Sequence, residues 1–340
     1  MLLGTRPHIP TVNGNYTRLD LLSWTAGQVA SSLLQISVAQ ALTDVILTSS
    51  STQTTFIDCR GMSRIQHHAF DKVKSLLETT PCTLVFDHVS DSLADDLVTV
   101  LNGISVQHSP LGTSDRWLMF TTQPSLPTLD MDATRKTIAD RLTSVVKTYA
   151  AASFHSFKDG GFKPLRSTPL KATGYFDGRA IVGTPTSLVW VVAAIADKIA
   201  SELEQPSGVL HEILGKRQLR FLAVSRSGIA LTAGLNWLVR SVQGMAFVDH
   251  FGPWQEVMEE HLDLNASRDV AYIYVGDFII AGTEARVAQA YARSCNSDIV
   301  LATAIGAALP TEHYGFPFKL LTLVPPLPEL VPAAKFRFGD

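Results

Sequence analysis

The segment 270–284 combines residue types that are suited to binding a phosphate group. An apolar run, 270–275, ends in Gly276-Asp277 and continues through Gly282 and Thr283 into a helical pattern. The first amide groups of a helix have no partner within it, and the helix dipole also attracts anions. Thr283 could add a hydroxyl donor or could simply cap the helix. The segment therefore predicts an anion site, and a capped helix in an ordinary α/β fold is the alternative.

A second segment, 222–230, is a strand-like run that turns at Ser225-Arg226-Ser227-Gly228 and enters another helical pattern. Its two serines invite comparison with serine nucleophiles. However, the turn lacks the Gly-x-Ser-x-Gly pattern, and the sequence places no His/Asp pair beside it. The sequence therefore disfavours hydrolase chemistry here.

With a third stretch, these segments resemble the type I phosphoribosyltransferases, and within that family the orotate phosphoribosyltransferase branch. Segment 270–284 is similar to the motif that binds phosphoribosyl pyrophosphate, and 222–230 to the strand and pyrophosphate loop. Segment 161–167, followed by Gly174-Tyr175-Phe176-Asp177, is similar to the branch's Phe-x-Leu-Lys-Ser-Gly and Tyr-Phe-Asp elements. The three segments follow the family's order between residues 130 and 310.

The resemblance implies a function: a nitrogen base displaces pyrophosphate from C1 of phosphoribosyl pyrophosphate, and Mg²⁺ holds the pyrophosphate. Catalysis then consists of positioning and of neutralising charge on the leaving group. By position, the catalytic residues are Asp277, Arg226 and Arg166, and Asp277 is also the metal ligand and the contact to the ribose hydroxyls. The expected substrate-binding residues are Ser225, Ser227 and Gly228 for pyrophosphate; Ile280, Ala281, Gly282, Thr283 and Glu284 for the 5′-phosphate; and Tyr175 near the base.

Two departures from the family pattern bear on catalysis. Gly276 stands where the family has a second acid, so one ribose contact is missing. The segment 249–269, the candidate for the loop that closes the active site, holds one base and six acids, and one minus six gives −5. Such a loop would repel a polyphosphate unless metal ions screen it. These departures favour an alternative, a nucleotide or phosphoribosyl pyrophosphate sensor without turnover that signals through its N-terminal domain.

The elements that must position these residues alternate between strand-like and helical patterns, which predicts an α/β fold with parallel sheet. The length of 340 residues favours two domains: a small α/β domain at 1–125 and a phosphoribosyltransferase-like domain at 130–340, joined by a Pro-containing linker. Asp132 is expected to cap the helix that follows the linker. Strands are expected at 54–58, 82–86, 117–122, 219–224, 245–248, 270–275 and 299–305, and helices at 69–78, 92–101, 132–151, 188–204, 229–240 and 283–293.

The region 56–86 also resembles the STAS fold of anti-sigma-factor antagonists, which implies a protein partner for this domain. The Ser-Ser-Gly phosphoacceptor turn of that family is replaced here by Gln66-His67-His68, and an unrelated α/β interaction domain is the alternative. The adjacent histidines point in different directions on a helix or a strand, so a zinc site is disfavoured.

Composition narrows the class of protein further. A net charge of −3 without a basic stripe argues against nucleic acid and favours a small phosphoribosyl or nucleotide ligand. Three scattered cysteines, no signal-like N-terminus and no long apolar run predict a cytoplasmic protein that does not enter a membrane. Only 17% of the residues are charged, and the resembled family commonly dimerises, so part of the apolar surface is expected to form a homodimer interface.

Overall fold

The computed structural model describes residues 8–11, 14–20, 54–59, 65, 67–108, 116–123, 130–165, 170–239, 241–248 and 269–338. Two compact units divide the chain between Ile138 and Ala139, within helix α4 (Met131–Ala152). Each unit contains its own sheet, and the chain has the α/β architecture that the sequence predicts. The linker proposed at 123–130 lies largely outside the described residues.

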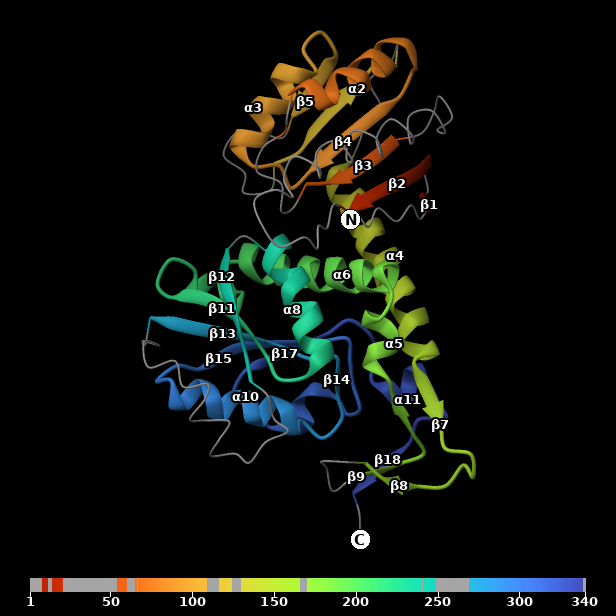
Figure 1. Cartoon of the computed structure of the whole chain (residues 1–340), viewed down its shortest axis with the longest axis vertical. Helices are drawn as coiled ribbons and strands as arrows, with labels where there is room; N and C mark the ends of the chain where they lie inside the picture. The colour runs from red at the N-terminus through yellow and green to blue at the C-terminus, as the bar shows by residue number, and fades with distance from the viewer. Residues whose placement is uncertain are drawn as a thin grey trace. The chain divides into compact units, whose positions relative to one another are not determined.

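The first unit is built on a mixed sheet of order β1-β2-β3-β4-β6-β5 (Figure 1). Strands β2, β3 and β4 are parallel, whereas β1 is antiparallel to β2, and β6 is antiparallel to both β4 and β5. The strands are β1 (His8–Thr11), β2 (Gly14–Asp20), β3 (Thr54–Asp58), β4 (Thr83–Asp87), β5 (Ser105–His108) and β6 (Leu118–Thr121).

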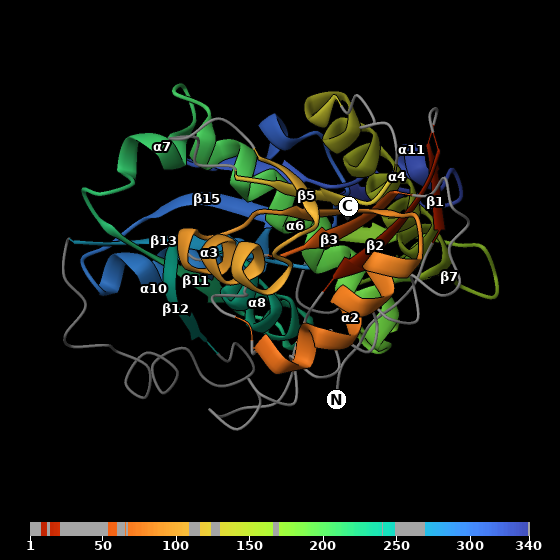
Figure 2. The same cartoon turned by 90° about the horizontal axis from the view of Figure 1, so that it is seen from above.

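Helices cover both faces of this sheet, which is why every residue of β4 is buried. Helices α2 (His67–Thr79) and α3 (Asp91–Val100) lie together on one face (Figure 2). Phe70 of α2 and Leu93 of α3 belong to one buried cluster with Phe86 and Phe120. On the other face, Met131 at the start of α4 packs among residues of β3, β4 and β6. Both helices expected at 69–78 and 92–101 are therefore present, with ends shifted by one or two residues.

The start of α4 differs from the sequence prediction. The cap is Asp130, whose Oδ1 accepts a hydrogen bond of 3.0 Å from the backbone N–H of Ala133. Asp132 instead lies in the first turn, where its charge complements the helix dipole. The prediction was wrong by two residues because either acid could begin the same helical pattern.

The second unit contains a fully parallel sheet of order β12-β11-β13-β15-β17. Its strands are β11 (Gln218–Ala223), β12 (Val242–Phe247), β13 (Val270–Val275), β15 (Ile299–Ala304) and β17 (Lys319–Thr322). The chain starts near the middle at β11, moves outward to β12, and then returns to the other side of β11 with β13. The direction of winding therefore reverses between β11 and β13.

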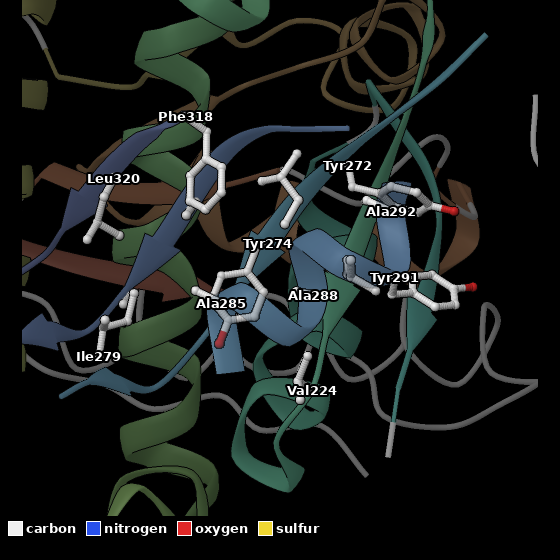
Figure 3. Packing of buried hydrophobic residues seen from close by; sticks show 14 of the residues in the cluster. Val224, Tyr272, Tyr274, Ile279, Ala285, Ala288, Tyr291, Ala292, Phe318 and Leu320 are labelled. Carbon is white, nitrogen blue, oxygen red and sulfur yellow. The ribbon is translucent and has the colours of Figure 1, made fainter. Parts of the chain in front are cut away.

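Helices lie on opposite faces of this sheet (Figure 1). Helices α6 (Pro185–Glu204) and α8 (Arg226–Leu238) cover one face, and α10 (Thr283–Ser294) covers the other. Figure 3 shows the core beneath α10, where Ala285 and Ala288 face the aromatic side chains of Tyr272 and Tyr274. All six residues of β13 are buried, as expected for a central strand covered on both faces.

Short elements surround the sheet. They are β7 (Phe154–Ser156), β8 (Lys163–Pro164), β9 (Leu170–Ala172), β10 (Gly174–Phe176), α5 (Gly178–Val182), α7 (Val209–Ile213), β14 (Phe278–Ile279), β16 (Gly306–Ala307), the 3-10 helix η1 (Thr311–Tyr314), α11 (Leu327–Leu330) and β18 (Phe336–Phe338). β7 pairs with β10, β14 with β16, and β9 with both β8 and β18. The β7–β10 hairpin and β14 are the short elements that shape the candidate site.

Candidate functional site

The reversal between β11 and β13 creates the place where a ligand is expected to bind. At such a point the loops after two neighbouring parallel strands diverge to opposite faces and leave a crevice at their carboxyl ends. The loop after β11 carries Ser225 and Ser227, and the loop after β13 carries Asp277. The topology therefore brings together the two segments that the sequence identifies.

Asp277 connects these loops. Its Oδ1 accepts a hydrogen bond of 2.7 Å from the N–H of Phe278, and its carboxylate also accepts one from the Ser227 hydroxyl. Burial raises the pKa of Asp277, these hydrogen bonds oppose the rise, and the nearby charge of Asp177 adds to it. Asp277 is therefore held in one orientation at the meeting point of three segments.

Gly178, at the start of α5, packs directly against this carboxylate. A Cβ atom at position 178 would overlap Oδ2 of Asp277. Only glycine allows the backbone to approach this closely. The cap of α5 is Asp177, whose Oδ1 accepts a hydrogen bond of 3.1 Å from the N–H of Arg179.

The loop after β11 leads directly into helix α8, and a side chain of the loop caps the start of this helix. Ser225 is the N-cap of α8, and its Oγ accepts a hydrogen bond of 3.0 Å from the N–H of Gly228. A Cβ atom at Gly228 would lie 2.8 Å from the carbonyl oxygen of Val275, so glycine is needed for α8 to approach β13. Arg226 is exposed in the first turn of α8, and Ser227 is buried.

Side chains from elsewhere in the second unit brace the loop after β13. The Tyr314 hydroxyl lies 2.6 Å from the carbonyl oxygen of Ile279 and 3.1 Å from that of Ile280. Arg286 donates a hydrogen bond of 2.7 Å to the next carbonyl, that of Ala281. Three consecutive carbonyl groups are therefore fixed by side chains of η1 and α10.

Gly282 ends the loop and is the N-cap of α10. Its φ of +75° lies in the left-handed region, and a Cβ atom there would clash with the ring of Phe316. Glycine fits this position because it tolerates a positive φ and has no Cβ atom to clash with the Phe316 ring. No side chain caps this helix, in contrast to α8.

A cavity of about 140 Å³ opens at the start of α10. Its lining combines apolar side chains with three polar ones, those of Tyr274, Thr283 and Glu284. The predicted phosphate-binding residues Ile280, Ala281, Gly282, Thr283 and Glu284 all line it, together with Leu165, Phe278, Ile279 and Ala285. The structure thus brings all five into one pocket.

Glu284 is the unusual member of this lining. Burial raises its pKa to about 7, and the charge of Asp277 contributes further. The buried Tyr274 hydroxyl is influenced by both carboxylates, and its pKa lies well above the ordinary value. Two acids and a phenol therefore share one electrostatic environment.

The side chains do not fit a resident magnesium ion. Mg²⁺ requires six oxygen ligands in near-octahedral geometry. In the described part of the chain no group of three or more His, Cys, Asp or Glu side chains could hold a metal ion. Asp277 accepts two hydrogen bonds, and one oxygen lies against Gly178. The role of Asp277 as a metal ligand stays a prediction, because Mg²⁺ is commonly held by one or two carboxylates together with the phosphates of a substrate.

The β7–β10 hairpin presents Tyr175 and Phe176 on opposite faces, because neighbouring side chains alternate along a strand. Phe176 packs at 4.9 Å against Phe278, next to Asp277, whereas Tyr175 lies against His155 at 5.2 Å. The structure therefore places Phe176, rather than Tyr175, against the loop after β13. Arg166 and most of the acidic segment 249–269 lie outside the described residues.

Sequence reasoning missed three residues that shape the site: Gly178, Tyr274 and Tyr314. Gly178 directly follows Tyr175-Phe176-Asp177, so the motif pointed to its neighbourhood. Tyr274 alternates with Ile273 in a strand that is buried on both faces, and Tyr314 lies thirty residues beyond the motif. No local pattern distinguishes these two tyrosines from core residues.

Comparisons with known proteins give structural matches only. No protein-family model and no curated protein sequence matches the chain. Among solved structures, orotate phosphoribosyltransferase from Aeropyrum pernix is 16% identical over 56% of this chain and 97% of its own, with a TM-score of 0.35. Adenine phosphoribosyltransferase from Saccharomyces cerevisiae is 14% identical over 53% and 99%, with a TM-score of 0.34.

A UMP synthase from Leishmania donovani matches a larger share of the chain. It is 11% identical over 92% of this chain and 62% of its own, with a TM-score of 0.39. Identities and TM-scores this low show no function for this chain. Separately, no helix in the described residues has the length and apolarity needed to cross a membrane.

Proposed function

We propose that the second unit binds phosphoribosyl pyrophosphate or a nucleoside 5′-phosphate and transfers the phosphoribosyl group between pyrophosphate and a nucleobase-like acceptor. The observation that carries this proposal is the hydrogen bond from Ser227 to Asp277 at the reversal point of the sheet. It joins the two segments whose sequences resemble the pyrophosphate loop and the phosphoribosyl motif. A ligand spanning both loops would find hydroxyl and amide donors on each side of one fixed carboxylate.

Each part of the site has a role in this proposal. Asp277 would accept hydrogen bonds from the ribose hydroxyls, because a buried carboxylate is a strong acceptor. The start of α8, from Ser225 to Gly228, would face the pyrophosphate, and the cavity at the start of α10 would take the 5′-phosphate. Magnesium would arrive on the pyrophosphate as part of the substrate.

Binding is tested by thermal unfolding with and without ligand. Phosphoribosyl pyrophosphate or a nucleoside 5′-monophosphate, each with Mg²⁺, should raise the melting temperature, because a ligand at about 100 times its Kd stabilises the native state by about 2.7 kcal/mol. Asp277→Asn should remove the shift. Asp91→Asn, which changes an exposed acid of the first unit, is the matched control and should retain it. The proposal is wrong if none of these ligands shifts the wild-type protein.

A sensor without turnover is the second candidate, and the surroundings of Gly276 favour it. A Cβ atom at this position would lie only 3.0 Å from the Tyr274 hydroxyl, so the second acid of the family motif would be crowded here. Pyrophosphate release with a panel of nucleobases separates the candidates. Ligand binding without release for any base would select the sensor.

We further propose that the protein is a cytoplasmic homodimer and that the first unit, with its STAS-like sequence, binds a protein partner. Exposed apolar side chains such as Met245 and Phe247 on the edge strand β12 support an interface between copies. Light scattering tests the dimer, and a monomeric mass at micromolar concentration would contradict it.

A further inference from the structure

The cavity at the start of α10 has an unusual composition for a phosphate site. Two of its loop residues, Ile280 and Ala281, offer no side-chain donor, and Glu284 contributes a carboxylate. A dianionic phosphate and a carboxylate in one partly buried pocket repel each other, because the protein screens charge less than water does. The pocket in this form therefore needs a further feature to hold a phosphate group.

A second observation indicates that the pocket receives a polar group. The Tyr274 side chain is 1% exposed and lines the cavity, and its hydroxyl makes no hydrogen bond within the described part of the chain. Figure 3 shows its oxygen directed toward the start of α10, beside Ala285. Buried hydroxyl groups are normally paired, so this one is placed to bond to a ligand or to water. Thr283 offers another hydroxyl in the same lining.

Burial and the charge of Asp277 both raise the pKa of Glu284. Asp277 lies in the loop before α10, and Asp177, at the start of α5, acts on Asp277 in turn. Tyr274, from β13, is neutral at physiological pH because its pKa is raised further. Arg286, two residues along α10, is engaged with the carbonyl groups of Ala281 and Tyr314. Burial and the charge of Asp277 therefore both favour the neutral form of Glu284.

We propose that this pocket binds a ligand phosphate together with one proton, which Glu284 carries and donates to a phosphate oxygen in a hydrogen bond. The proton comes from solvent, no covalent bond changes, and it returns to solvent when the ligand leaves. The inference rests on the proposed function, which places the 5′-phosphate in this pocket. It makes Glu284 a specificity-determining residue that couples nucleotide affinity to pH.

The coupling has a definite sign. A bound phosphate raises the pKa of Glu284 above its ligand-free value of about 7, so binding takes up a proton at higher pH. Affinity should be greatest below about pH 7 and should then fall by about tenfold for each pH unit until the pKa of the bound state is reached. A neutral side chain at position 284 would remove this dependence.

The test compares wild-type protein with Glu284→Gln, which keeps a donor but has no charge. The dissociation constant of a nucleoside 5′-monophosphate is measured by calorimetry from about pH 5.5 to about pH 8.5, and the ratio of wild type to variant is taken at each pH. The ionisation of the nucleotide itself cancels in this ratio. Glu212→Gln, an exposed acid in the first turn of α7, is the matched control, and the nucleoside without phosphate is the control ligand.

We expect the ratio for the nucleotide to rise by about tenfold per unit above about pH 7, while the ratios for the nucleoside and for the Glu212 variant stay constant. A constant ratio for the nucleotide would overturn the proton coupling but leave the proposed function intact, because the nucleotide still binds. A nucleoside ratio that rises equally would also overturn it, because the coupling would not involve phosphate. Failure of wild type and variant to bind the nucleotide at any pH would overturn both proposals.

Discussion

Replacing Glu284 by Gln should change how the stability of the ligand-free protein depends on pH. Burial raises the pKa of this carboxyl group from 4.5 to about 7 in the native state. The native state therefore binds a proton that the unfolded state has released across this interval. Native stability contributed by this proton is fully present below about pH 4.5 and is lost as the pH rises through about 7.

The size of the effect follows from the shift. One pKa unit corresponds to 1.36 kcal/mol, so the raised pKa represents about 3 kcal/mol in full. About 2.5 kcal/mol of this falls between about pH 5 and about pH 8, where the protein can be studied without strong acid. The wild-type free energy of unfolding should thus decrease, relative to that of Glu284→Gln, by about 2.5 kcal/mol over this range.

Urea unfolding at several pH values, with hydrogen exchange of β13 identifying the transition of the second unit, measures the difference. Glu212→Gln should follow the wild-type curve, because Glu212 is exposed. The curves of wild type and Glu284→Gln should converge at low pH and separate as the pH rises. Parallel curves would refute the reasoning, because they would mean that the Glu284 carboxylate costs nothing to bury.

Three further changes test other parts of the structure by urea unfolding. Gly178→Ala should destabilise the second unit by about 1–3 kcal/mol and weaken nucleotide binding, because the new Cβ overlaps Asp277; unchanged binding would contradict this packing. Arg135→Ala should cost the first unit about 3 kcal/mol, because it leaves the buried Asp87 without the guanidinium that bonds both its oxygens; a loss below about 1 kcal/mol would contradict the ion pair. Tyr314→Phe should cost about 1–3 kcal/mol, because the carbonyls of Ile279 and Ile280 lose the hydroxyl proton that they share and the Leu309 N–H loses its acceptor; equal stability would mean that water replaces the hydroxyl.

Much of the fold followed from local patterns. β3 and β13 occupy the residues that the sequence predicts, because β3 is rich in β-branched and aromatic residues and β13 is a short apolar run, both of a length that suits a strand. Helix ends were less well determined. The prediction began α8 at Ile229, whereas the helix begins at Arg226, because Ser225 caps it through Gly228 and adds a turn whose residues have no apolar period.

The candidate site was predicted in its parts and not in its arrangement. The sequence identified Ser227, Asp277 and Glu284 as ligand-binding residues, but it could not show that Ser227 bonds to Asp277. That contact depends on the strand order, in which β13 returns to lie beside β11. Strand order is set by packing among distant segments, and no periodicity along the chain encodes it.

The sequence by itself determined the α/β class, the strand and helix that flank each loop, and the departure of Gly276 from the resembled motif. These properties depend on residue type and on spacing over a few residues, and both can be read directly from the linear sequence. Only the tertiary structure decided that Glu284 shares a partly buried pocket with Tyr274 and that its pKa is raised to about 7. Burial and the field of neighbouring charges depend on which distant side chains meet, and this becomes fixed only when the chain has folded.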